Sequence, residues 1–296
     1  MWWLKLQRLL LPNWHKRYGA TFPWFAIIVG AMPQIEHESS AETNPESEWF
    51  GARRVKPEEK TLLVQNVFAS VAWRYDLMND VMSAGLHRFF KNRLVALMSP
   101  KAGQNILDVA GGTGDVALRC ARHSHSKARI VVCDLNPAML EAGRAKMRGE
   151  KGVSGIEWMT GNAETLPLPD GSVDTYSIAY GLRNVTLIDR ALREAARVLR
   201  PGGRFYCLEF TSGVRRGLKP LFDAYCRIVM PPLGQWITKD GGAYRYLAES
   251  IRKFPDQPAL AKRIDAAGFD ETQWINLLGG IAVIHSARRP GLPSAR

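Results

Sequence analysis

Apolar residues alternate between short β-like runs and helical stretches from about residue 49 onward. Five mostly apolar runs predict buried strands at residues 105–110, 129–134, 156–160, 173–180 and 203–210. Between most of them, the residues at 115–122, 137–148 and 187–199 repeat with helical spacing. An alternation of strands and helices is typical of a doubly wound parallel sheet, so an α/β fold is predicted.

Further helices and two more strands extend this pattern on both sides. Residues 60–74 and 86–98 predict helices ahead of the first strand, and residues 271–276 and 281–286 predict a final pair of strands. The region between, at 218–237, 243–253 and 258–267, is mostly helical in pattern, and its first part is more apolar than one helix face requires. The sequence therefore predicts a mostly parallel, seven-stranded sheet with N-terminal helices and a helical insertion that forms a lid.

The first 48 residues do not share this pattern. Residues 1–35 contain four Lys or Arg and no acidic residue, whereas residues 36–50 contain five glutamates and neither Lys nor Arg. The acidic, serine-rich stretch 36–48 predicts a disordered linker. Residues 1–31 are compatible with a secretory signal, an organelle transit peptide, a membrane-surface anchor, or a start codon assigned too early with Met32 as the true start. We expect 1–48 to be an unstructured extension, 49–289 to be the folded domain and 290–296 to be a disordered tail.

Composition excludes several classes of protein. An apolar content of 46% is enough to form a core, so the chain as a whole is not disordered. The longest apolar run, at 22–32, has about half the length of a membrane-spanning helix, and no such helix is predicted. The four cysteines lie far apart without a Cys-x-x-Cys pair, which predicts reduced core thiols and excludes a disulfide or zinc framework. The net charge of +12 is concentrated after residue 50, and a basic surface suits nucleic acid, an anionic membrane or an acidic substrate.

A glycine-rich turn follows the predicted strand at 105–110 and precedes a helix. Its residues are Gly111, Gly112, Thr113 and Gly114. Glycine lets the backbone turn sharply and approach a ligand closely, and the N-terminus of the following helix presents free N–H groups. The turn also satisfies the pattern of dinucleotide-binding sites, so by itself it fits NAD as well as S-adenosylmethionine.

Three features around the turn favour S-adenosylmethionine. Asp108 lies inside the first strand, where a carboxylate reaches the cationic methionine end of that cofactor. Asp134 closes the second strand and is placed to bridge ribose hydroxyls, a role common to both ligands. Asn162 and Ala163 follow the third strand and suit an adenine edge. In the alternative interpretation, Asp108 caps a turn and Asp134 caps the helix that begins at residue 137.

Two further segments resemble a known family. Residues 67–91 resemble the first signature of the ubiquinone/menaquinone biosynthesis C-methyltransferases, the UbiE-type family, with matches at Tyr75, Asp76, Met78, Asn79, Ser83 and His87. Residues 197–203 and 208–210 resemble the second signature, and the resemblance covers roughly 49–289. It implies a class I methyltransferase fold of the Rossmann-like type, S-adenosylmethionine as the cofactor, and C-methylation of the ring of a polyprenyl benzoquinol, a demethylmenaquinol or both.

The implied reaction requires a ring of high electron density, which deprotonation of a ring hydroxyl supplies. Arg183 follows the end of the fourth strand, where open α/β sheets bind ligands, and its cation is placed to stabilise a phenolate. Asn184 is placed to hydrogen-bond a ring oxygen, and Tyr75 to contact the quinol directly. Asp76 and His87 are the candidates for carrying the proton.

Structural roles are the alternatives for these residues. Tyr75 and Asp76 would then only end the preceding helix. Arg183 would pair with Asp189 or Glu209, and His87 would be a helix-facing polar contact. The histidines at 123 and 125 have no acidic or cysteine partner at ligand spacing, so no metal site is predicted.

Two other functions compete with quinol methylation. The basic charge after residue 50 motivates an RNA methyltransferase, although no RNA-binding appendage is recognisable. The other is a non-catalytic subunit of a quinone-synthesis complex. For the preferred function we expect a prenylated quinol as substrate, other quinone-biosynthesis enzymes as partners, and no nucleic acid, and a homodimer is compatible with the sequence.

A membrane surface is the expected site of action. The helix at 86–98 contains Arg88, Lys91 and Arg93, which predicts peripheral contact with an anionic bilayer. The expected location is therefore the cytoplasmic side of the inner membrane in a bacterium, or the matrix face of the inner mitochondrial membrane in a eukaryote.

Overall fold

The computed structural model describes residues 48–50, 53–83, 85–211, 213–214 and 249–291, together with residues 220, 224 and 246. The chain divides into two compact units, residues 1–45 and 46–296, and all described residues belong to the second. The predictions for the segment 1–47, for most of the insertion at 218–248 and for the end of the tail at 292–296 lie outside the described residues.

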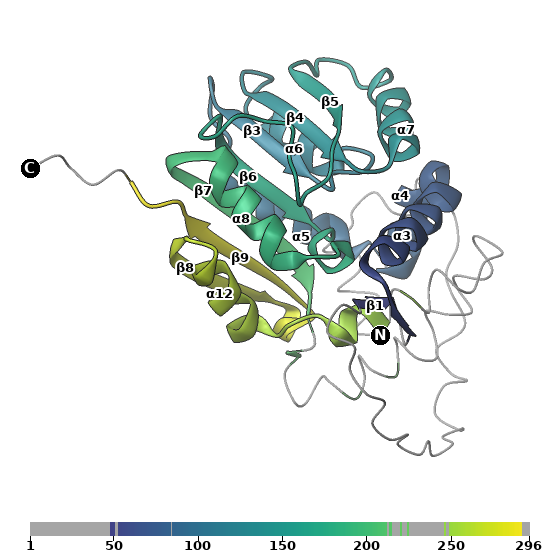
Figure 1. The fold of residues 1–296 in the computed structure, drawn as a ribbon. Coiled ribbons are helices and arrows are strands. Elements are labelled where there is room, and N and C mark those ends of the chain that lie inside the picture. Colours follow the sequence, from purple (N-terminus) through teal and green to yellow (C-terminus); the bar gives the residue numbers. More distant parts are fainter. Residues whose placement is uncertain are drawn as a thin grey trace, which may run out of the picture. The chain divides into compact units, whose positions relative to one another are not determined.

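A seven-stranded sheet forms the centre of the second unit, in the order β5-β4-β3-β6-β7-β9-β8 (Figure 1). Its strands are β3 (Asn105–Val109), β4 (Arg129–Asp134), β5 (Ile156–Thr160), β6 (Val173–Ala179), β7 (Leu199–Phe210), β8 (Asp270–Leu277) and β9 (Ala282–Arg288). Strands β3 to β7 run parallel, and β9 pairs antiparallel with both β7 and β8. The predicted α/β fold with a mostly parallel, seven-stranded sheet is confirmed.

Helices cover both faces of this sheet. The described helices include α3 (Pro57–Val71), α4 (Tyr75–Met82), α5 (Leu86–Met98), α6 (Asp115–His123), α7 (Pro137–Met147), α8 (Ile188–Val198) and α12 (Gln257–Ala266), with 3-10 turns η2 (Ala72–Arg74), η3 (Leu182–Asn184) and η5 (Leu278–Gly280). Successive strand residues point to opposite faces, so Leu107 joins the apolar core that contains Leu192 of α8, whereas Ile106 joins the one that contains Leu94 of α5. Strands buried on both faces are apolar throughout, which explains why the sequence shows continuous apolar runs there.

The N-terminal elements differ from the prediction at their boundaries. Helix α3 begins at Pro57, because the fixed φ of proline suits the first helical position, and η2 separates its end from α4. Ahead of α3, the short strands β1 (Glu48–Phe50) and β2 (Arg53–Val55) pair as a hairpin that the sequence did not predict. Strands of three residues give too short an alternation to recognise. Residue 48, predicted to end a disordered linker, is instead the first residue of β1.

Strand β7 begins earlier than predicted. Its first residue is Leu199, which pairs with Val173, and the register shifts before Thr175 pairs with Arg204. Pro201 and Gly202 suggest a turn in the sequence, but the strand passes through them at this irregularity.

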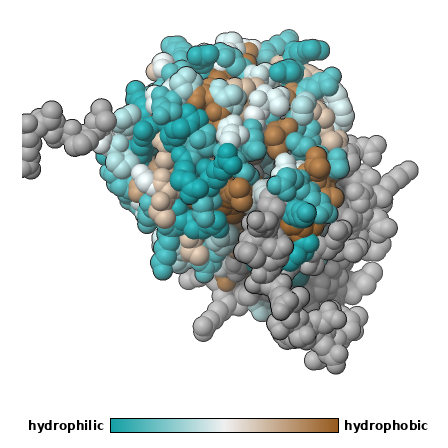
Figure 2. All heavy atoms as spheres, viewed as in Figure 1, coloured by the Kyte–Doolittle hydropathy of each residue, from teal (hydrophilic) through white to brown (hydrophobic). Residues whose placement is uncertain are grey.

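The described chain presents a largely hydrophilic surface with scattered hydrophobic residues on the face drawn in Figure 2. Cys120, Cys133 and Cys207 are free and buried, which confirms the thiol prediction for these three, whereas Cys226 lies outside the described residues. Within the described ranges, no helix is long and apolar enough to cross a bilayer. The same residues contain no group of three or more His, Cys, Asp or Glu that could hold a metal ion.

Candidate active site

A crevice opens at the carboxyl ends of the central strands. Strand β3 lies between β4 and β6: the chain adds β4 and β5 on one side of β3 and then continues with β6 and β7 on the other side. Open α/β sheets bind ligands at the carboxyl ends of the strands where the strand order reverses in this way. The residues that follow β3 and β6, Ala110 and Tyr180, have φ angles of 50° and 59°. Left-handed backbone at residues other than glycine is strained and clusters at functional sites. Both residues line the pocket in this crevice.

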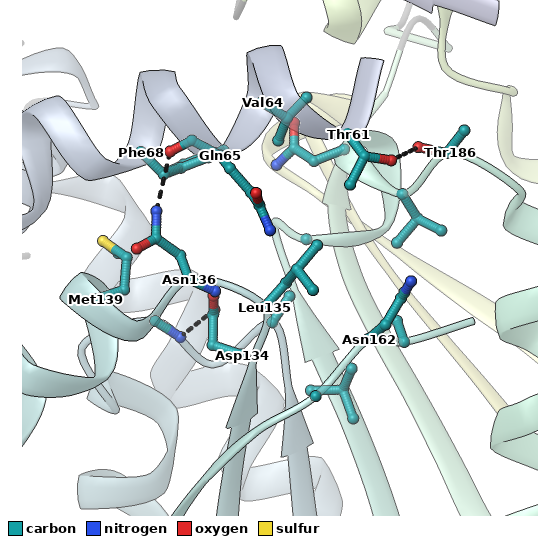
Figure 3. Close-up of a pocket in the computed structure, with 18 of the residues that line it drawn as sticks. Thr61, Val64, Gln65, Phe68, Asp134, Leu135, Asn136, Met139, Asn162 and Thr186 are labelled. Atoms are coloured by element: carbon teal, nitrogen blue, oxygen red, sulfur yellow. Dashed lines mark hydrogen bonds between the residues drawn. The ribbon is translucent and has the colours of Figure 1, made fainter. Parts of the chain in front are cut away.

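The pocket has a volume of about 790 Å³ including its open mouth. Its floor comes from the loops that follow β3, β4, β5 and β6, and helix α3 lies across it (Figure 3). Residues of α3 that line it are Thr61, Val64, Gln65 and Phe68. The sequence analysis missed these residues, because helical periodicity places α3 on the fold but does not say which element it covers.

Hydrogen bonds fasten α3 across the pocket. Lys60 Nζ donates to the carbonyl of Val185 at 3.0 Å, and the hydroxyls of Thr61 and Thr186 are 2.9 Å apart. At the other end of the pocket, Asn136 Nδ2 donates to the carbonyl of Gln65 at 3.0 Å (Figure 3). These bonds connect α3 with the loops after β4 and β6.

Asp134 closes β4 and lines the pocket. Its Oδ2 accepts from the backbone N–H of Gly112 and its Oδ1 from that of Asn136, both at 2.9 Å. A carboxylate has about four acceptor positions, so two remain for ligand hydroxyls. Burial raises the pKa of Asp134. The alternative that Asp134 caps the next helix is wrong, because Asn136 is the N-cap of α7 and accepts from the N–H of Ala138.

The glycine-rich turn brings the backbone close to its neighbours. A Cβ atom on Gly111 would lie 2.8 Å from Val132 Cγ1 and 2.9 Å from the carbonyl oxygen of Asp108, so no other residue fits there without a shift. Gly112 has a φ of 56° and Gly114, the N-cap of α6, a φ of 73°, both in the region that favours glycine. The buried Thr113 hydroxyl donates to Asp76 Oδ1 at 2.9 Å.

Asp108 is fully buried inside β3. Its Oδ1 accepts from the Ser177 hydroxyl at 2.8 Å, whereas its Oδ2 has no hydrogen-bond partner among the described residues. Burial raises the pKa of Asp108 to about 7. An unpartnered buried carboxylate oxygen at the turn is what a cationic ligand group would satisfy, so this observation fits the predicted cofactor.

The loop after β5 forms another wall of the pocket. Asn162 Oδ1 accepts from the backbone N–H of Glu164 at 2.9 Å, and both Asn162 and Ala163 line the cavity. In Figure 3 the amide of Asn162 points into the space below α3. Leu135 and Met139 line the cavity too. Together these groups give an apolar cleft with a polar edge, which suits an adenine ring.

Arg183 lies in a buried ion pair. Its Nη1 donates to Glu209 Oε2 at 2.6 Å and to the carbonyl of Tyr180 at 2.7 Å, and Glu209 is fully buried. The guanidinium also lies 5.9 Å from the ring centres of Tyr180 and Phe210. Arg183 does not line either described pocket, and the pairing with Glu209 is the structural alternative considered for it. Its contacts make it a positioning residue for Tyr180.

The other predicted catalytic residues divide into two groups. Tyr75 and Asn184 line the main pocket, where the Asn184 Oδ1 accepts from the Tyr246 hydroxyl at 3.0 Å. Asp76 and His87 line neither described pocket. Lys146 Nζ donates to Asp76 at 2.7 Å, so this carboxylate joins α4 to α7 and to the glycine-rich turn.

His87 makes the polar contact that was its structural alternative. Its Nε2 lies 2.8 Å from Asp80 Oδ1, and burial lowers its pKa. Asp80 also pairs with Arg88, and together these partners hold the pKa of this buried carboxyl at about 2. Because His87 is buried away from both described pockets, its predicted role in carrying the substrate proton is not supported by its contacts.

The basic residues of α5 do not form the predicted membrane-facing row. Lys91 is buried and donates to Asp115 Oδ2 at 3.0 Å, and Arg88 pairs with the buried Asp80. Of the three, Arg93 is the exposed one. A helix face that points into the protein therefore carries charges that the sequence analysis assigned to the surface.

Solved structures of other proteins share this fold. A SAM-dependent methyltransferase from Thermotoga maritima, described as a possible histamine N-methyltransferase, has the same fold with a TM-score of 0.55 at 19% identity, covering 76% of this chain and 99% of that one. A SAM-dependent methyltransferase from Aquifex aeolicus gives a TM-score of 0.50 at 16% identity, covering 67% and 89%. The fold that these structures share is that of the class I, S-adenosylmethionine-dependent methyltransferases.

Sequence relatives identify the family. The model of the ubiE/COQ5 methyltransferase family matches residues 54–289, and the chain belongs to this family. The Ubiquinone/menaquinone biosynthesis C-methyltransferase UbiE of Dinoroseobacter shibae is 46% identical over 245 residues, which is 83% of this chain and 98% of that protein. The mitochondrial 2-methoxy-6-polyprenyl-1,4-benzoquinol methylase of Arabidopsis thaliana is 49% identical over 255 residues, covering 80% and 88%.

Proposed function

We propose that this protein methylates a ring carbon of a prenylated benzoquinol, a demethylmenaquinol or both, with S-adenosylmethionine as the methyl donor. The relatives with more than 45% identity carry names for this reaction in ubiquinone and menaquinone biosynthesis. The observation that carries the proposal is the unpartnered Asp108 Oδ2 beside the glycine-rich turn, in the same crevice as Asp134. One carboxylate suits a cationic cofactor end and the other suits ribose hydroxyls.

Different residues of the crevice would bind different parts of the cofactor. S-adenosylmethionine, when bound, supplies an already activated methyl group. Asp134 would hold its ribose, Asn162 and Ala163 its adenine, and the backbone of Gly111–Thr113 would lie along its length. Helix α3 excludes water from this side, because its bonds close the pocket over the loops.

The quinol ring would meet the aromatic wall of the pocket. Tyr75 lines both described pockets and packs edge-on against Phe68, with 6.0 Å between the ring centres. The Asn184 amide lies on the same wall and is a donor for a ring oxygen, which holds the ring in place for transfer. Arg183 acts from behind this wall by fixing the carbonyl of Tyr180.

Methyl transfer to two acceptors tests the substrate class. We expect the purified protein to methylate a reduced, short-chain demethyl-quinol and to leave total RNA unlabelled when both are offered with methyl-labelled cofactor. The oxidised quinone is the matched control, because it lacks the ring hydroxyl that must lose a proton. Labelled RNA would favour the RNA methyltransferase, and cofactor binding without transfer to any acceptor would favour the non-catalytic subunit.

Removal of the Asp134 carboxylate should weaken cofactor binding. We expect Asp134→Ala to lower the affinity for S-adenosylmethionine by about 1–3 kcal/mol, because hydrogen bonds to a charged acceptor are lost. Calorimetric titration measures this change. Asp170→Ala is the control, since that aspartate is exposed and pairs with Arg197 away from the pocket. Unchanged affinity in Asp134→Ala would refute the ribose assignment.

Membrane contact is part of the proposal, because a long-tailed quinol resides in a bilayer. The consecutive elements α3, η2, α4 and α5 contact one another, and each carries an exposed apolar side chain. These side chains are, in the same order, Leu62, Trp73, Leu77 and Phe89. Trp73 is 69% exposed. Hydrophobic residues appear among hydrophilic ones over α3 and α4 in Figure 2. Aromatic and aliphatic side chains on helices suit shallow insertion at a membrane interface.

Vesicle flotation tests this contact. We expect the protein to float with anionic vesicles, less at high salt, and Trp73→Ser to bind roughly tenfold more weakly because one large apolar side chain is lost from the interface. Trp274→Ser is the control, because it removes another exposed tryptophan, one that is 41% exposed and lies on the edge strand β8, not on the N-terminal helices. Flotation that does not change with the Trp73→Ser substitution, with the charge of the lipid or with the salt concentration would contradict the proposal.

The proposed location follows from the substrate. Plant relatives from Arabidopsis thaliana and Oryza sativa are named as mitochondrial, and bacterial relatives match equally well. We place the protein at the matrix face of the inner mitochondrial membrane in a eukaryote, or at the cytoplasmic face of the inner membrane in a bacterium. Other quinone-biosynthesis enzymes are the proposed partners there.

A further inference from the structure

A second, smaller pocket lies beside the glycine-rich turn. Its walls carry the side chains of Tyr75, Lys91, Asp108 and Asp115, together with the backbone of residues 111–113. It has a volume of about 320 Å³ including its opening. Asp108 and Tyr75 already have roles in the proposed function, but the ammonium group of Lys91 does not.

Lys91 is buried, and its ammonium group has N–H donors that Asp115 does not use. The Nζ atom donates to Asp115 Oδ2 at 3.0 Å and lies 6.0 Å from the centre of the Tyr180 ring. An ammonium group has three donors, and the described chain offers this one an acceptor at Asp115. Buried donors need partners, so the remaining N–H groups call for a further acceptor.

The charge of Lys91 persists in spite of its burial. Burial alone would lower its pKa, but the neighbouring Asp115 carboxylate raises it above the ordinary lysine value. The same ion pair, with Arg119 on its outer side, holds the pKa of Asp115 well below its usual range despite burial. Lys91 therefore presents a fixed positive charge to the pocket.

Asp108 lines the same pocket, and its side chain needs a hydrogen-bond donor where Lys91 needs an acceptor. Its buried Oδ2 lacks a donor, whereas the Lys91 ammonium keeps donors beyond the one that Asp115 accepts. A free amino-acid group carries both complements, an ammonium and a carboxylate. We propose that Lys91 binds the α-carboxylate of the methionine end of S-adenosylmethionine, while Asp108 Oδ2 accepts from the α-ammonium. This inference rests on the proposed function, since it needs that cofactor in the crevice.

Two ligands that differ only in the α-carboxylate test the inference by calorimetry. We expect the wild-type protein to bind S-adenosylmethionine about 10- to 100-fold more tightly than decarboxylated S-adenosylmethionine, the size of a charge-assisted hydrogen bond. Lys91→Met should bind the two ligands alike. The ratio is the readout because the charge of Lys91 also lowers the pKa of Asp108, so its loss weakens the ammonium contact of both ligands equally.

Two further variants keep the test independent of folding. Lys91→Met/Asp115→Asn removes both charges of the pair, so neither partner is left buried and alone, and it should show the same collapsed ratio. Arg119 is the other partner of Asp115, and Arg119 itself does not line the pocket. Arg119→Gln should therefore keep the wild-type ratio. A wild-type ratio in both Lys91 variants, or no preference in the wild type, would overturn the inference. Failure of the wild type to bind either ligand would overturn the proposed function itself.

Discussion

Asp108→Asn should stabilise the cofactor-free protein by up to about 4 kcal/mol at pH 8. Burial raises the pKa of Asp108 from 3.8 to about 7, so the folded protein holds this proton where the unfolded chain has lost it. Stability therefore falls as pH rises from about 4 to about 7, and the loss is complete above the folded pKa. Asparagine keeps the acceptor for Ser177 without the charge.

Chemical denaturation at pH 5 and pH 8 measures this effect. The stabilisation by Asp108→Asn should be larger at pH 8 than at pH 5, whereas Asp170→Asn, at an exposed position, should show no such difference. The same variant should bind S-adenosylmethionine more weakly, because the carboxylate that costs stability is the one that meets the cationic end of the cofactor. A variant that is both no more stable and fully able to bind would show that Asp108 is an ordinary core residue.

Arg183→Ala should destabilise the protein by about 3–5 kcal/mol. It removes the cation that pairs with Glu209 at 2.6 Å and leaves that carboxylate fully buried without a counter-charge. It also removes the shorter of two hydrogen bonds to the carbonyl of Tyr180, whose left-handed backbone lines the pocket, and leaves the one from Asn184 Nδ2 at 3.2 Å. Thermal and chemical denaturation give the change in the free energy of unfolding.

A double variant separates the structural role of Arg183 from a catalytic one. Arg183→Met/Glu209→Gln removes both charges and should recover most of the lost stability, with cofactor affinity close to the wild type because neither residue lines the pockets. A stable double variant whose kcat falls and recovers as pH approaches about 10, the ordinary pKa of a phenol, would assign Arg183 to the phenolate directly. Near-wild-type stability of Arg183→Ala would contradict the ion-pair account.

The sheet could be predicted because its central strands are buried on both faces. Strands β3, β4 and β6 appear in the sequence as apolar runs, and the glycine-rich turn after β3 marks the ligand edge. The hairpin of β1 and β2 could not be predicted, since its strands have three residues each. Likewise, no local pattern states that α3 covers the cofactor pocket, because that depends on the path of the chain between elements.

Side-chain roles were harder to predict than the fold. The burial of Lys91 had a signal in the sequence, because it shares the helical stripe of Leu94, Val95 and Met98, but a lysine among other basic residues suggests a surface. Asp108 and Asp134 could be placed from their positions on β3 and β4. The partner of Arg183 could not be chosen, because two candidate acids fit the sequence and only the tertiary structure brings Glu209 beside it.

The position of the transferred methyl group tests the central claim most directly. The purified protein would be incubated with S-adenosylmethionine labelled with carbon-13 in its methyl group and with a reduced, short-chain demethyl-quinol, and the product examined by carbon NMR. We expect the labelled methyl on a ring carbon, with no label on either ring oxygen. A labelled methoxy group, or no labelled quinol at all, would contradict the assignment of this protein as a quinol C-methyltransferase.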